Sequence, residues 1–151
     1  MKKNQKTSDV LNVYKVIGVA KYSKLSDDDK IRTWKIVRNL KPIAEQFDAD
    51  AKDVSERMKP ADNFVELWQK AQEYEKGNKD AMTEAEYKAF CKELKDYNQL
   101  VSKAIEELLA VEVEVDFEPL TEEAFGLLMA SNDWTMQQAT MVGDFVVNSH
   151  I

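Results

Sequence analysis

Two long segments of the chain carry apolar residues at alternating steps of three and four positions, and this spacing constrains the fold more than any other feature. The first seam consists of Val37, Leu40, Ala44, Phe47, Ala51, Val54 and Met58. The second seam consists of Tyr87, Phe90, Leu94, Tyr97, Val101, Ala104 and Leu108. We expect Ile31 and Trp34 to extend the first seam towards the N-terminus. Two seams of equal length predict an elongated antiparallel helical hairpin whose long arms pack together.

Short sequence signals mark the ends of these helices. Ser26 is followed by three aspartates, which gives the first arm an N-cap and an acidic first turn. Pro42 lies inside that arm, where we expect a kink or the junction of two helices. A shorter helix over residues 64–76 separates the two arms and ends at Gly77. A capping box at residues 83–86 opens the second arm.

Residues 111–117 read VEVEVDF and predict a β-strand directly after the second arm. Apolar and acidic residues alternate there with the period of a half-buried strand, and Pro119 ends the ladder. A single strand leaves backbone groups unpaired, so it needs a partner. We expect that partner in residues 19–25, whose lysines would face the acids across a two-stranded ladder at one end of the hairpin.

The chain finishes in a small apolar helical unit. Thr121 is the expected cap of its first helix, and Asn132 or Asp133 is the expected cap of its second. Large apolar side chains at this spacing form either a core or an adaptable surface for a protein partner, a role that methionine suits. The residues of the partner-binding interpretation are Phe125, Met129, Trp134, Met136, Met141 and Phe145.

Charge is distributed unevenly along the sequence. Residues 1–25 contain six lysines and one aspartate, whereas residues 104–151 contain ten acidic residues and no lysine or arginine. Either the two ends attract each other within the fold, or the acidic part faces a basic partner. The net charge of −7 disfavours nucleic-acid binding beyond weak contacts of the N-terminal lysines.

Few residues suit catalysis or metal binding. Cys91 lacks a histidine partner, because the single histidine, His150, is the next-to-last residue. Asp48, Asp50 and Asp53 have neither the spacing nor the glycine of a calcium loop. The sequence therefore predicts a non-enzymatic protein with no catalytic, cofactor-binding or metal-binding residue, and with no cofactor.

Length and composition predict a single domain over residues 1–151. A hydrophobic fraction of 44% and a charged fraction of 32% are typical of a helix-rich globular chain. The expected parts are a basic N-terminal segment with a strand (1–25), a helical hairpin (26–110), and an acidic strand with apolar C-terminal helices (111–151). No apolar run approaches the length that spans a bilayer, so no membrane contact is expected.

Two stretches together resemble a known group of proteins. They are KYSKLSDDDKIRTWKIVRNLKPIAEQF before the hairpin turn and EELLAVEVEVDFEPLTEEAFGLLMASND after it. Their order is similar to that of small helical proteins of tailed bacteriophages and prophages of Bacteroides-type hosts. The resemblance covers most of the chain in layout, and EVEVDFEPL with its following helix is its most specific part. It implies a phage or prophage setting and no activity.

These observations lead to two hypotheses of function. The first is a non-enzymatic structural or assembly protein of a phage-like particle, located in the virion or the host cytoplasm. It would act by docking to other phage structural proteins or to itself. The alternative is a soluble intracellular regulator or inhibitor whose acidic C-terminal third binds a basic groove on a host protein.

Overall fold

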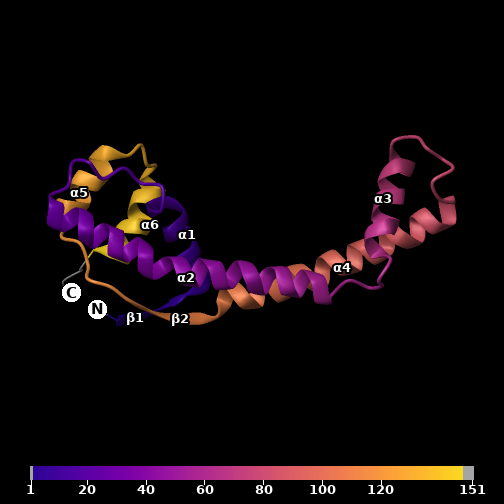
Figure 1. The fold of residues 1–151 in the computed structure, drawn as a ribbon, viewed down its shortest axis with the longest axis horizontal. Helices are drawn as coiled ribbons and strands as arrows, with labels where there is room; N and C mark the ends of the chain where they lie inside the picture. Colours follow the sequence, from indigo (N-terminus) through magenta and orange to yellow (C-terminus); the bar gives the residue numbers. More distant parts are fainter. Residues whose placement is uncertain (1, 148–151) are drawn as a thin grey trace. The chain divides into compact units, whose positions relative to one another are not determined.

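Six helices and a two-stranded sheet make up residues 2–147, the part of the chain that a computed structural model describes (Figure 1). The elements in order are β1 (Lys2–Lys6), α1 (Thr7–Ile17), α2 (Asp27–Arg57), α3 (Phe64–Glu75), α4 (Glu84–Ala110), β2 (Glu112–Asp116), α5 (Glu122–Ser131) and α6 (Met136–Val146). The mainly α fold with a small β ladder, expected from the sequence, is confirmed. By its contacts the chain divides into two units, one of residues 1–48 with 109–151 and one of residues 49–108.

Capping side chains begin α2 and α4 where the sequence predicts them. The Ser26 hydroxyl accepts a hydrogen bond from the Asp29 amide at 3.2 Å. Thr83 and Glu86 form the expected reciprocal box, with distances of 3.1 and 3.3 Å. Gly77 follows α3 with a φ of +106°, a conformation that favours glycine. Pro42 lies within α2, which is one helix from Asp27 to Arg57 and not a junction of two.

The partner of the acidic strand is β1, so the expected pairing with residues 19–25 is wrong. β1 and β2 are antiparallel, and their register places Lys2 opposite Asp116 and Lys6 opposite Glu112. Basic residues therefore do face acidic ones, as expected, but they come from the very start of the chain. The backbone amide and the hydroxyl of Thr7 both donate to the Val111 carbonyl, at 2.9 and 2.8 Å, which fixes this register.

Helix α1 supplies part of the core of the first unit, although the sequence analysis expected no helix there. Val10, Val13 and Ile17 repeat at helical spacing and are almost fully buried. Within this unit, α1, α5 and α6 gather around the N-terminal part of α2 (Figure 1). The remaining buried members of the core are Leu25, Ile36, Leu40, Val115, Phe117, Leu120, Ala124, Phe125, Leu128, Val142, Phe145 and Val146.

The start of α2 corrects one prediction. Ile31 and Trp34 are exposed, at 52% and 57%, and do not extend the apolar seam. Backwards from Val37, the alternation of three and four requires a step of four, which leads to Thr33. Thr33 is indeed buried, and its hydroxyl donates to the Asp29 carbonyl at 2.8 Å. Trp34 follows one residue later, about 100° around the helix, and so points away from the core.

The second unit has its own aromatic core between α3 and α4. The Phe64 ring centroid lies 4.9 Å from that of Tyr97 and 5.5 Å from that of Phe90. The Tyr97 hydroxyl donates to the Ser55 carbonyl near the end of α2, at 2.9 Å. The other buried members of this cluster are Ala71 and Met82. Each unit therefore buries its own cluster. That the whole chain forms a single domain, as expected from the sequence, stays a prediction.

Candidate functional site

The last two helices, α5 and α6, are positioned by side-chain caps. The Thr121 hydroxyl accepts from the Ala124 amide at 3.1 Å, as the sequence predicts. The cap of α6 is Thr135, which forms a capping box with Gln138, so the expectation of Asn132 or Asp133 is wrong. Asn132 instead ties α5 to the loop after α1. Its amide group exchanges two hydrogen bonds with the Lys21 backbone, both at 2.8 Å.

An open groove of about 620 Å³ lies between α5 and α6. Two methionines stand at its surface, because Met136 is 82% exposed and Met129 is 39% exposed. Glu122 and Asp144 are the charged residues of its lining, which contains no basic side chain. The other lining residues are Phe125, Ala139, Thr140, Gly143 and Val147. We call this surface the α5–α6 groove.

The six residues expected to bind a partner fall into three groups. Phe125, Met129 and Met136 line the α5–α6 groove. Trp134, which precedes α6, and Met141 within α6 line a separate cavity of about 540 Å³ together with α1 residues. Phe145 is buried in the core, with its ring stacked on that of Phe117 at 5.7 Å. Met129 and Met136, both in the first group, are the most exposed of the six, whereas Trp134 and Met141 are half-buried.

Gly143 allows α5 and α6 to approach closely beneath the groove. A Cβ atom at this position would lie 2.9 Å from Cε1 of the Phe125 ring, closer than real Cβ contacts. Gly126 on α5 offers the matched comparison, because a Cβ there would meet no atom within 4 Å. The two glycines are both inside helices and differ in this contact.

Gly126→Ala is expected to stabilise the protein by roughly 0.5–1 kcal/mol, the usual gain from replacing glycine inside a helix. Gly143→Ala is expected to lose this gain or to destabilise, because the new methyl group must displace the Phe125 ring. Urea denaturation of the two variants measures the difference. An equal gain at both positions would show that Phe125 does not pack against Gly143.

Lys3 joins the first strand to the end of α6. Its ammonium group lies 4.6 Å from the Phe145 ring centroid and 5.2 Å from that of Phe117, and it donates to the Phe145 carbonyl. Burial lowers the pKa of Lys3 below its ordinary value, and the Asp144 carboxylate opposes that shift. The contact is structural: it holds β1 against the carbonyl end of a helix, where a cation is favourable.

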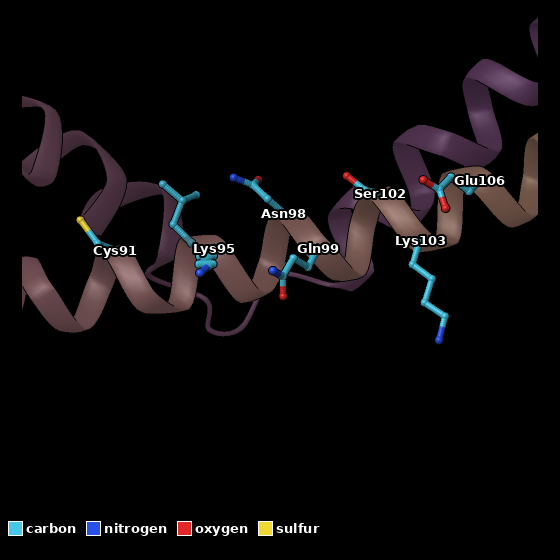
Figure 2. Close-up of a pocket in the computed structure, with 8 residues that line it drawn as sticks. Cys91, Lys95, Asn98, Gln99, Ser102, Lys103 and Glu106 are labelled. Carbon is cyan, nitrogen blue, oxygen red and sulfur yellow. The ribbon is translucent and has the colours of Figure 1, made fainter.

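A different groove, also of about 540 Å³, runs along α4 in the unit of residues 49–108. Figure 2 shows its labelled side chains, from Cys91 to Glu106, spaced along a single helix. Cys91 is exposed there. Nearby, a hydrogen bond of 2.6 Å to the Glu75 carboxylate raises the pKa of Tyr87 well above its ordinary value, so Tyr87 stays protonated. These polar side chains do not converge on one point and form no catalytic set.

Among residues 2–147, the acidic and cysteine side chains form no cluster of three that could hold a metal ion. Nor does any helix in that range combine the length and apolar character needed to cross a membrane. His150 lies outside the described residues.

A second exposed surface lies on α2 and was not predicted from the sequence. Residues 30–41 contain five basic residues and no acidic one, a signal that was present in the sequence. The exposed Trp34 stands within this run, and the Arg38 guanidinium lies 4.9 Å from its ring centroid. Trp34 with Ile31, Arg38 and Lys41 forms what we call the Trp34 face. All four side chains are exposed.

The chain was compared with protein families, curated proteins and solved structures. No protein-family model, no curated protein and no solved structure matches the chain.

Proposed function

We propose that this protein is a non-enzymatic docking protein that binds another protein through the α5–α6 groove. The observation that carries the proposal is the pair of exposed methionines, Met129 and Met136, at an open groove that contains two acids and no base. Methionine side chains are flexible and polarisable, and they serve binding surfaces that accept apolar anchors. The acidic lining selects a partner whose anchor is apolar and whose surroundings are basic.

The setting we propose for this docking is the assembly or structure of a phage-like particle. That part rests on the resemblance of the segment around EVEVDFEPL to phage and prophage proteins. The alternative, a regulator that presents its acidic C-terminal third to a host protein, has less support. Several of those acids already face basic groups of the same chain: Glu114 lies 3.9 Å from Lys2, and Glu118 lies 3.0 Å from Arg32.

A charge placed at Met136 tests the proposed docking. Met136→Lys is expected to weaken binding of a synthetic amphipathic helix of leucine and lysine by about tenfold or more, which is ~1.4 kcal/mol. The reason is that the new ammonium group enters the apolar groove and repels the basic probe. Gln137→Lys is the matched control, because it adds the same charge to an exposed neighbour that does not line the groove. Fluorescence anisotropy of the labelled probe gives both affinities.

Equal weakening by the two variants would count against the groove, since it would show only general attraction between an acidic protein and a basic helix. Circular dichroism of both variants checks that α6 remains folded. Met136 is the first residue of α6 and is highly exposed, so its replacement removes little packing.

A further inference from the structure

We propose that the occupant of the α5–α6 groove is the Trp34 face of a second copy of this chain. The inference rests on the proposed function and names its partner. Two unlike surfaces of one protein would then meet, the groove of one copy and α2 of the next. Such an interface is heterologous, and it extends into a ring or a filament because every copy keeps one free surface of each kind.

Charge complementarity is the first argument. The run of residues 30–41 that bears the Trp34 face carries five basic side chains and no acid. Residues 104–151, which include both helices of the groove, carry ten acids and no lysine or arginine. Arg38 and Lys41 follow Trp34 along the same face of α2, where Lys41 lies 3.8 Å from Glu45, while Glu122 and Asp144 line the groove. Each surface therefore supplies the charge that the lining of the other lacks, although Arg32 in the same run already pairs with Asp29 and Glu118.

The match of apolar groups is the second argument. A tryptophan at a protein surface exposes one of the largest apolar side chains, and tryptophan and arginine are the residues most enriched among binding hot spots. Trp34 is 57% exposed although its helix belongs to the core of the first unit. The groove offers a complementary set, Met129, Met136 and Phe125, in a volume of about 620 Å³. Methionine sulfur also makes favourable contacts with aromatic rings.

The two surfaces do not cover each other within one chain, which leaves both available to a second copy. Both belong to the first unit, yet Trp34 and Met136 are both exposed. Two unpartnered apolar surfaces with opposite surrounding charge on the same molecule favour self-association over two unrelated partners.

Nucleic acid is the competing occupant of the Trp34 face, because arginine and an aromatic ring also bind single strands. The charge of the molecule disfavours it. The chain has a net charge of −7, and its acidic C-terminal part belongs to the same unit as the face.

Complementation between two variants of the full chain tests the proposal. Trp34→Ala removes the anchor and leaves the groove, whereas Met136→Lys blocks the groove and leaves the anchor. Sedimentation velocity of the unaltered protein is expected to show a mass that rises with concentration. Each variant alone is expected to stay monomeric at concentrations about tenfold above those at which the unaltered protein associates. Their equimolar mixture is expected to form a pair of one copy each, because only one intact groove and one intact anchor can meet.

Two control variants keep the result specific. Gln137→Lys adds a charge next to the groove without lining it, and Tyr22→Ala removes an exposed aromatic ring outside both surfaces. Both variants are expected to associate like the unaltered protein. A mixture of the two test variants that stays monomeric, although the unaltered protein associates, would overturn the proposal. So would an unaltered protein that stays monomeric at every concentration.

The outcomes separate this inference from the proposed function. If the unaltered protein stays monomeric but Met136→Lys still abolishes binding of the leucine–lysine helix, the groove docks a protein other than a second copy. If neither association nor helix binding occurs, the docking function itself is wrong. A fluorescent single-stranded oligonucleotide that binds the unaltered protein and is lost in Trp34→Ala, with no self-association, would assign the Trp34 face to nucleic acid and overturn the inference.

Discussion

Phe64→Ala is expected to lower the free energy of unfolding of the second unit by about 3–5 kcal/mol, the usual cost of emptying a buried phenylalanine site. Phe64 is the centre of that core, because its ring lies 5.6 Å or less from those of Trp68, Phe90 and Tyr97. The other large buried side chains of this cluster are Met82, Phe90 and Tyr97. Removing the ring leaves a cavity among these side chains, and the cost depends on how far they can move into it.

Native-state hydrogen exchange measures where this loss falls. We expect α3 and the part of α4 up to Val101 to lose protection, while α1 and α6 keep it, because each unit buries a separate apolar cluster. Val65→Ala is the matched control. Val65 is next to Phe64 in the sequence but its side chain is exposed, so the change is expected to cost less than about 0.5 kcal/mol. Parallel loss of protection in α1 and α6 would instead show one cooperative domain over the whole chain.

Local capping chemistry made most helix boundaries predictable. Ser26, Thr83, Gly77 and Thr121 act within a few residues of their own position, so their roles can be recognised from short sequence patterns. Thr135 escaped because two polar residues before it, Asn132 and Asp133, offered equally good caps. The structure uses Asn132 for long-range hydrogen bonds to the Lys21 backbone, a role that no local pattern reveals.

The pairing of the two strands was not predictable from hydrophobic patterning. β1 reads KKNQK and has no apolar residue, so it lacks the alternation that indicates a strand. Its place depends on backbone pairing with β2 and on the contacts of Lys3 with Phe117 and Phe145, far away in the sequence. What the sequence did indicate correctly was the match of basic and acidic residues across the ladder.

The candidate site was predictable in part. The apolar composition of the C-terminal helices pointed to Met129 and Met136, which lie at the groove. It could not separate them from Phe145, which has the same helical spacing but faces the core. The prediction for Trp34 was wrong in the opposite direction. This apolar residue near the seam was assigned to the core, although its position on the helix places its side chain at the surface.

Leu40→Ala is expected to destabilise the first unit by about 2–5 kcal/mol, whereas Trp34→Ala on the same helix is expected to cost less than about 1 kcal/mol. Leu40 is fully buried among residues of the first core. The Trp34 side chain is 57% exposed, and the packing contact that it forms with Arg38 lies on the helix surface. Removing the larger side chain, Trp34, is therefore expected to cost less free energy of unfolding than removing Leu40.

Chemical denaturation followed by circular dichroism compares the two variants without relying on tryptophan fluorescence, which Trp34→Ala would itself change. A similar cost for both would place Trp34 in the core, as its proximity to the apolar seam suggested. The tryptophan could then no longer serve as an anchor for a second copy, because a defect in association would follow from unfolding. A stable Trp34→Ala variant that no longer associates would instead assign this side chain to binding, because the loss of association could not then follow from unfolding.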